Sequence, residues 1–121
     1  MANAAKNRGN QYERDVEKLC RAAGFPDAKR TRAGRREDEG DIHLDRWSRY
    51  ILQTKDVVTP QWRPWLDELA EQVAAAKAEH GALVVKRRGS GGRPALHLAV
   101  MTLDDYLALL AKLDLRGTSG G

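Results

Sequence analysis

The stretch that decides the fold lies between residues 40 and 55. It reads Gly40-Asp-Ile-His-Leu-Asp45, then Arg46-Trp-Ser-Arg49, then Tyr50-Ile-Leu-Gln-Thr-Lys55. Apolar and polar residues alternate in the first and last segments, which is typical of half-buried strands. The sequence therefore predicts a hairpin of two strands joined by a turn at residues 46–49.

Side-chain alternation predicts which polar groups share a face of this hairpin. Asp41 shares a face with His43 and Asp45, and Gln53 shares one with Lys55. If the strands pair antiparallel, Asp41 can meet Gln53 and Lys55 at one end. These residue types are poor strand formers beside apolar neighbours, so their presence indicates a functional site.

The rest of the chain supplies helices and further strands around the hairpin. Helical spacing of apolar residues predicts a first helix over about 10–23, ended by Gly24, and a second that runs to about His80. Strands are expected at 27–33, 82–85 and 95–101, and a last helix begins at Thr102 as N-cap. The fold class is therefore α/β, a mixed β-sheet flanked by helices in the order α-β-β-β-α-β-β-α.

Two finer expectations concern the ends of the chain and of the second helix. The first eight or so residues and the Gly/Ser-rich tail 116–121 are expected to be loose. Asp67 and Glu68 are expected to complement the positive end of the second helix's dipole.

Length and composition restrict the class of protein. The chain has 121 residues, 41% of them hydrophobic and 31% charged, so we expect one globular domain over 1–115. It contains no run near the ~20 apolar residues of a membrane span and no signal-peptide core at its start. Cys20 is the single cysteine, which excludes a disulfide framework and a cysteine-rich zinc site. These features predict a cytoplasmic protein.

The net charge of +4 is small, but the basic residues are clustered. The first cluster is Lys29, Arg30, Arg32, Arg35 and Arg36; the second is Lys86, Arg87 and Arg88, with Arg93 nearby. Clustered cations favour a polyanionic partner such as nucleic acid. Ordinary solvated surface charge is the alternative.

The polar groups of the hairpin suit one chemistry in particular. Carboxylate and amide oxygens are hard ligands of the kind that Mg²⁺ prefers. A lysine beside such a site can orient a water molecule and offset charge on a phosphorane transition state. Asp41, Gln53 and Lys55 therefore suggest phosphodiester hydrolysis, although this spacing alone occurs in many chains.

A family resemblance supports this interpretation and covers residues from about Lys6 to Leu110. The residues that carry it are Asn7-x-Gly9-x-x-Tyr12-Glu13-Arg14, Ala23-Gly24-Phe25, Arg30-x-Arg32-x-Gly34, Gly40-Asp41-Ile42 and Ile51-Leu52-Gln53-Thr54-Lys55. This pattern resembles the PD-(D/E)xK nuclease superfamily, and most closely the archaeal-type Holliday junction resolvases with their bacteriophage relatives.

The resemblance implies a restriction-endonuclease-like sheet, Mg²⁺ as cofactor with Mn²⁺ able to substitute, and a homodimer that cuts four-way DNA junctions. Asp41 would be the central metal ligand and Glu13 a helix-borne carboxylate acting on the metal. Gln53, the Thr54 carbonyl and Lys55 would complete the site. Arg30 and Arg32 would contact backbone phosphates near the scissile bond.

Gln53 departs from the family pattern, because most members have Glu at this position. A neutral amide removes one negative charge from the metal site, which should lower metal affinity; Glu37, Asp38 or Glu39 could compensate. Gln53 thus prompts one alternative, a DNA-binding protein of the same fold with a weakened site. A related nuclease for flap, mismatched or single-stranded DNA is a second, because the fold supports several substrates, and a small basic scaffold with incidental motif matches is the third.

Overall fold

The structure is a computed structural model that describes the backbone of residues 4–31 and 41–113 and the side chains of 7–31 and 41–113. Its elements follow the order α-β-β-β-α-β-β-α. They are α1 (Ala4–Ala22), β1 (Lys29–Arg30), β2 (Ile42–His43), β3 (Tyr50–Lys55), α2 (Trp62–Ala76), β4 (His80–Arg87), β5 (Leu96–Val100) and α3 (Leu103–Lys112).

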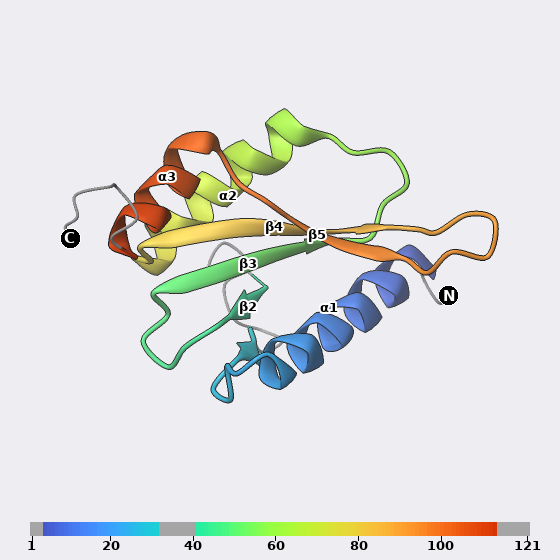
Figure 1. The fold of residues 1–121 in the computed structure, drawn as a ribbon, viewed down its shortest axis with the longest axis horizontal. Helices are drawn as coiled ribbons and strands as arrows, with labels where there is room; N and C mark the ends of the chain where they lie inside the picture. The colour runs from blue at the N-terminus through green and yellow to red at the C-terminus, as the bar shows by residue number, and fades with distance from the viewer. Residues whose placement is uncertain (1–3, 32–40, 114–121) are drawn as a thin grey trace, which may run out of the picture.

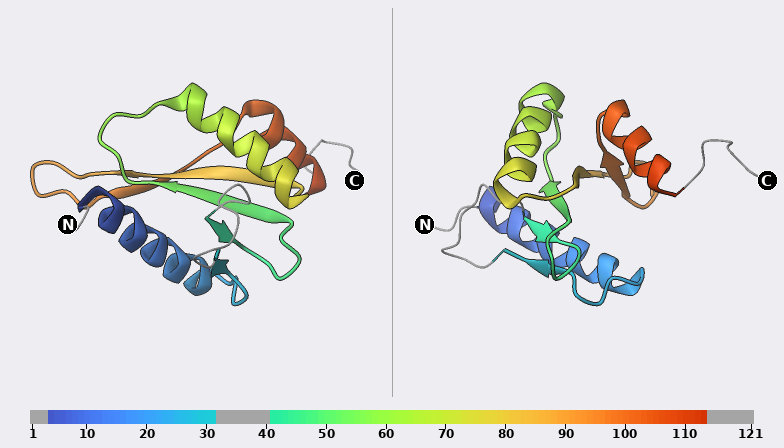
Figure 2. Two further views of the ribbon diagram at one scale, coloured as in Figure 1. Left: turned by 180° about the vertical axis from the view of Figure 1, so that it is seen from behind. Right: turned by 90° about the vertical axis from the view of Figure 1, so that its left-hand side faces the viewer.

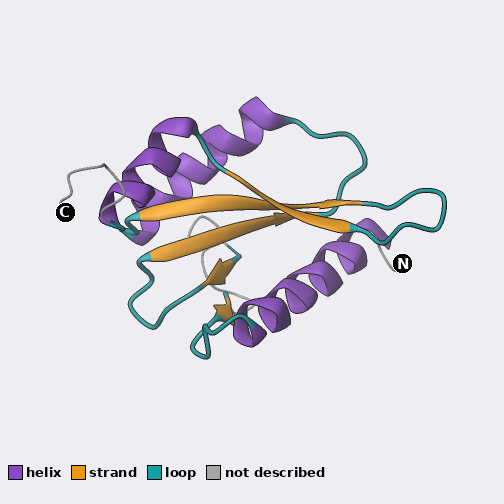
Figure 3. Ribbon diagram, in the orientation of Figure 1, coloured by secondary structure: helices purple, strands orange, loops and turns teal. Residues whose placement is uncertain are grey.

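The strands form one mixed sheet in the order β1-β2-β3-β4-β5. β3 and β4 are parallel and are connected through α2, whereas the other neighbouring strands pair antiparallel. Helix α1 covers one face of the sheet, and α2 and α3 lie on the other side (Figures 1 and 2). The α/β class with a mixed sheet flanked by helices is confirmed, as Figure 3 shows by element type.

Each face of the sheet has its own apolar core. On the α1 side, Tyr12, Val16, Ile42 and Val84 pack together with Cys20 and Leu52 at the margin. On the α2 side, the cluster is Trp65, Leu69, Leu83 and Val85, with Leu66, Val73 and Val100 against it. Ile51 and Leu83 are completely buried, so the two middle strands, β3 and β4, are the centre of the molecule.

The ends of two helices differ from the sequence prediction. α1 begins at Ala4, within the segment expected to be loose, because Ala4, Ala5 and Lys6 are strong helix formers. Its end is as predicted, since Gly24 takes a positive φ of 108° and Phe25 N donates to Cys20 O.

α2 ends at Ala76 rather than near His80. Lys77 adopts the left-handed conformation at φ 54°, which turns the chain so that His80 already begins β4. The helix starts at Trp62, so its first turn contains no acidic residue, and the dipole role expected for Asp67 and Glu68 is wrong.

The strands are where the sequence predicts them, but their lengths differ: β1 and β2 have two residues each where 27–33 and 41–45 were expected, with 32 and 33 outside the described residues, and β4 extends beyond 82–85 at both ends. The 46–49 turn joins antiparallel β2 and β3, and Thr102 caps α3 by accepting a hydrogen bond from Asp105 N. The tail 116–121 lies outside the described residues. In the part of the chain that is described, no helix has the length and apolar character needed to cross a lipid bilayer.

Two glycines give opposite predictions for stability. A Cβ at Gly81 would lie 2.7 Å from Val73 Cγ2 and 3.0 Å from Leu69 Cδ1, because β4 packs closely under α2. A Cβ at Gly9 would meet nothing within 4 Å. Urea unfolding should show Gly81→Ala destabilised by about 1–3 kcal/mol through overpacking. Gly9→Ala should be stabilised by about 0.5–1 kcal/mol through helix propensity. Equal effects of the two substitutions would contradict this packing.

Candidate active site

Asp41 is fixed in place by both its backbone and its side chain. Its N–H donates to Leu52 O at 3.0 Å, and its carbonyl accepts from Thr31 N at 2.9 Å. Its Oδ2 accepts from the N–H of Thr54 at 2.8 Å and from the Thr54 hydroxyl at 3.1 Å. The carboxylate that precedes β2 is therefore held directly against the end of β3.

The surroundings of Asp41 disfavour its charged form. Burial raises the pKa of this carboxyl, while the two hydrogen bonds from Thr54 lower it. The positive charge of Lys55 also lowers the pKa of Asp41, and the negative charge of Glu68 raises it. Asp41 thus lies within electrostatic reach of Lys55, although its direct hydrogen bonds are with Thr54.

Gln53 and Lys55 meet on the α2 face of β3 through a third residue. Glu68 Oε1 accepts from Gln53 Nε2 at 3.0 Å and lies 3.4 Å from Lys55 Nζ. The Lys55 ammonium is also 5.3 Å from the centre of the Trp65 ring. Glu68 therefore supplies a negative charge beside the neutral Gln53.

Sequence reasoning missed this role of Glu68 and assigned the residue to the helix dipole. A usable signal was present, because Glu68 lies three residues after Trp65 and next to Leu69, both buried against the sheet. A helix-borne carboxylate beside an apolar stripe is placed to reach the sheet that the stripe covers.

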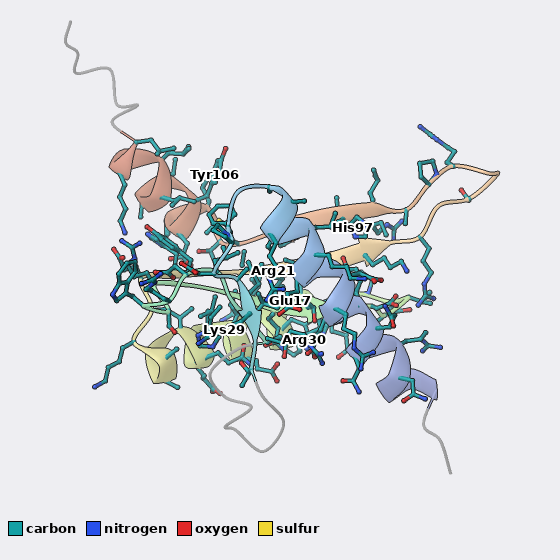
Figure 4. The ribbon with its side chains drawn as sticks, turned by 90° about the horizontal axis from the view of Figure 1, so that it is seen from below. Glu17, Arg21, Lys29, Arg30, His97 and Tyr106 are labelled. Atoms are coloured by element: carbon teal, nitrogen blue, oxygen red, sulfur yellow. The ribbon has the colours of Figure 1, made fainter. Side chains whose placement is uncertain are left out.

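Glu13 approaches Asp41 from the opposite face, where α1 lies. Burial raises the pKa of Glu13, the negative charge of Asp41 raises it further, and Arg30 lowers it. Arg30 Nε lies 3.2 Å from Glu13 Oε1, and Arg30 N donates to Glu17 Oε2 at 3.0 Å. In Figure 4, Glu17 and Arg30 lie together where β1 runs against α1.

Within the described chain, the candidate site contains few groups that could bind a metal ion, but one of them is an unpaired buried oxygen. Among the described residues, no three His, Cys, Asp or Glu side chains are grouped to hold a metal ion. Gln53 Oε1, however, is buried and has no hydrogen-bond partner in the described ranges 4–31 and 41–113. Because buried acceptors are rarely left unsatisfied and Mg²⁺ takes one or two carboxylates plus waters and substrate phosphates, Asp41 and Gln53 fit a sparse magnesium site. The compensating candidates Glu37, Asp38 and Glu39 lie outside the described residues.

Both basic segments reach adjacent residues of α1. Lys86 of β4 lies with its Nζ 5.8 Å from the Tyr12 ring centre, while Arg30 of β1 pairs with Glu13. Arg88 is bound at 2.7 Å to Asp56. The other predicted DNA contacts Lys29 and Arg87 are exposed, and Arg32, Arg35 and Arg36 lie outside the described residues.

His43 has a structural role in the turn. It is buried, and its Nδ1 lies 2.6 Å from the hydroxyl oxygen of Ser48. Ser48 has a positive φ of 55°. This contact braces the β2–β3 connection, which in turn fixes the register between Asp41 and β3.

Comparison of the chain with protein-family models, with curated proteins and with solved structures finds no match.

The opposite pKa shifts of two aspartates predict opposite pH dependences. Burial raises the pKa of Asp41, so above the ordinary carboxyl pKa the folded state binds more protons than the unfolded state. The free energy of unfolding then falls as pH rises through the raised pKa. The variant Asp41→Asn has no carboxyl to titrate at this position and does not lose this free energy. Its free energy of unfolding relative to the natural protein should therefore increase with pH.

Asp45→Asn is the matched control. Burial raises the pKa of Asp45, but hydrogen bonds from Arg49 and Tyr50 outweigh this and lower the pKa overall. Its stabilising contribution is present at neutral pH and lost in acid, so Asp45→Asn should lose relative stability as pH rises. Urea unfolding between pH 3 and pH 8 measures both trends, and parallel curves for the two variants would contradict the assignment.

Proposed function

We propose that this protein is a metal-dependent endonuclease of the Holliday junction resolvase type, which hydrolyses phosphodiester bonds in branched DNA. One observation carries the proposal: Asp41 is fixed against β3 while Gln53 and Lys55 of the same strand converge on Glu68. Polar groups are expensive to bury without a purpose, and their gathering at one end of the central strand favours catalysis. The proposal includes a restriction-endonuclease-like sheet, supported by the order of the elements.

Asp41 and the amide oxygen of Gln53 would hold Mg²⁺, with Mn²⁺ as a substitute; the Thr54 carbonyl and Glu13 are further candidate ligands. The bound ion would polarise the scissile phosphate and neutralise part of its negative charge. The neutral Gln53 contributes no charge to this site, so the carboxylate of Glu68 beside it restores the negative potential that attracts a cation.

Lys55 is the proposed group for orienting the attacking water. Its side chain is only 17% exposed and is held between Glu68 and the Trp65 ring, which limits its rotamers. A positioned ammonium also offsets the charge that develops on the phosphorane. Glu68 is then a positioning residue that acts through Lys55 and Gln53.

Glu13 is the proposed proton acceptor. Its raised pKa makes the carboxylate a stronger base than an exposed glutamate, which brings it closer to the range useful near neutral pH. The Arg30 side chain that pairs with Glu13 is 29% exposed, so a backbone phosphate could compete with Glu13 for it. Binding of DNA would thus release Glu13 from its ion pair.

The substrate is proposed to be recognised by shape. The cations of β1 and of β4 reach neighbouring residues of α1, so phosphates of two strands can contact one region of the protein. Contacts to phosphates position a nucleic acid without reading its sequence. A related nuclease for flaps, mismatches or single strands would use the same groups.

A two-fold homodimer is the proposed functional unit, because resolving a junction requires paired cuts. Helix α3 has no buried residue within the described chain, and its Leu103, Tyr106 and Leu107 are exposed. β5 forms the outer edge of the sheet beside it. A second copy covering this apolar surface would satisfy both features.

The first prediction of this proposal is cleavage of a labelled four-way junction. With Mg²⁺ or Mn²⁺ we expect symmetric cuts confined to the junction, a protein mass of two chains by light scattering, and no cuts in EDTA. A linear duplex of matched sequence and Asp41→Ala serve as controls. Cutting that survives Asp41→Ala would overturn the site, and tight junction binding without cuts in either metal would favour the DNA-binding alternative, which the neutral Gln53 suggests.

A charge exchange tests Glu68. Glu68→Gln should lower cleavage by about 10–100-fold, as supporting groups around metal sites do. Gln53→Glu alone places two carboxylates in contact and should not help, because like charges that close oppose ionisation. The double variant Gln53→Glu with Glu68→Gln restores one carboxylate and should recover part of the activity. Glu71→Gln, one turn along on the exposed side of α2, is the control. Full activity of Glu68→Gln would remove this residue from the site.

A further inference from the structure

A small pocket lies between α1 and the ends of β3 and β4, and of its lining residues only Lys86 has a role in the function proposed above. It has a volume of about 250 Å³ and is lined by Arg8, Tyr12 and Asp15 of α1 and by Asp56, Lys86 and Arg88 from the ends of β3 and β4. Its α1 residues recur at helical spacing, so a single face of the helix forms one wall. Figure 1 shows this part of α1 beneath the ends of β3 and β4.

The charges in the pocket leave a positive surplus. Arg88 and Asp56 neutralise each other at 2.7 Å, and Asp15 Oδ1 accepts a hydrogen bond from Gln11 Nε2 at 2.9 Å. In the described part of the chain, neither Arg8 nor Lys86 forms an ion pair. Two cations against the one remaining anion, Asp15, give the pocket a net charge of +1.

The wall beneath these cations is neutral and rigid. Tyr12 is 1% exposed, and its hydroxyl lies 3.0 Å from His97 Nδ1 on β5. Burial, together with the charges of Asp56 and Asp15, raises the pKa of Tyr12 to about 12, so the phenol keeps its proton. The Lys86 ammonium lies over this ring, 5.8 Å from its centre. Figure 4 shows His97 beside the N-terminal half of α1.

The pocket follows the candidate site directly along two elements. Tyr12 precedes Glu13 on α1, and Asp56 follows Lys55 at the end of β3. Because Tyr12 packs in the core on the α1 side, the pocket lies on the face of the sheet from which Glu13 approaches Asp41, and a ligand extending from that side of the site would reach it. The volume is below the roughly 300–1,000 Å³ of most small-molecule pockets, so it suits a single ionic group rather than a whole nucleotide.

From this juxtaposition we infer that the pocket is a phosphate subsite, in which Arg8 and Lys86 bind one backbone phosphate of the DNA strand next to the scissile linkage. Arg8 would donate from its planar guanidinium and Lys86 from its ammonium, while Asp56 holds Arg88 at the rim. The subsite would set the register of the strand in the active site. This inference rests on the proposed function for the identity of the polyanion.

Binding measured without metal tests the subsite separately from cleavage. The anisotropy of a labelled four-way junction is followed in EDTA over a series of salt concentrations, with Arg8→Gln, Lys86→Gln and the double variant. Loss of one phosphate contact should reduce the slope of log K against log salt by about 0.9. Lys86→Arg should keep the natural slope, and Lys18→Gln, an exposed cation on the same helix outside the pocket, should change nothing.

A second substrate series identifies the phosphate. Single uncharged methylphosphonate linkages are placed in turn at positions flanking the cleavage site. Neutralising one particular phosphate should weaken binding of the natural protein but not of the double variant, because the double variant has already lost the cations that contact this phosphate. Equal losses at every position would reveal general electrostatic attraction and overturn the subsite.

The outcomes separate the two proposals. If the double variant and Lys18→Gln bind the junction with the same affinity and salt dependence while cleavage still requires Asp41, the proposed subsite is wrong and the proposed nuclease function stands. If the natural protein cuts nothing but its binding depends on Arg8 and Lys86, the nuclease fails and the subsite remains. A natural protein that binds no DNA at low salt overturns both. Circular dichroism of each variant confirms that it is folded.

Discussion

The carboxylate of Asp41 bound to the N–H and hydroxyl of Thr54 is the contact on which the rest of the site depends. It joins the residue before β2 to the end of β3 and places a negative charge where the sheet has little access to water. The hydrogen bonds from Thr54 compensate only part of the desolvation, since the pKa of Asp41 remains raised. A bound cation or a nearby ammonium group would stabilise the charged form of this carboxylate, and the ammonium of Lys55 does so in part by lowering the pKa of Asp41.

The two faces of the sheet contribute different parts of the candidate site. From the α1 face come Glu13 and its partner Arg30, and from the α2 face come Gln53, Lys55 and Glu68. Asp41 lies between them, because it influences the pKa of Glu13 and is influenced by Lys55 and Glu68. The sheet thus separates the two groups of polar residues, and the groups proposed for catalysis come from both of its faces. Both α1, which contributes Glu13, and α2, which contributes Glu68, are therefore needed to form the candidate site.

The three described helices differ in how much of their surface they bury against the sheet. α1 and α2 bury Tyr12, Val16, Trp65 and Leu69 and hold the two cores together. α3 buries no residue within the described chain, and its Lys112 is tied to Glu79 by an ion pair at 2.6 Å. Exposed ion pairs contribute about 0–1 kcal/mol, so the Lys112–Glu79 pair adds little to the attachment of α3, and the exposed apolar surface of this helix is the one assigned to the proposed homodimer.

Local patterns of alternation and capping were enough to predict the α/β class, the hairpin, the common face of Gln53 and Lys55, and the cap at Thr102. Apolar periodicity did not reveal the start of α1, where the first residues follow helix propensity, or the end of α2, where Lys77 turns into the left-handed conformation. Three relations come from the tertiary structure alone: Glu68 faces Lys55, Thr54 holds Asp41, and Arg8 and Lys86 line one pocket. These pairs are 13 residues apart or more in the chain. Their proximity depends on how α1 and α2 lie across the sheet, which burial of the two apolar cores sets and no local pattern specifies.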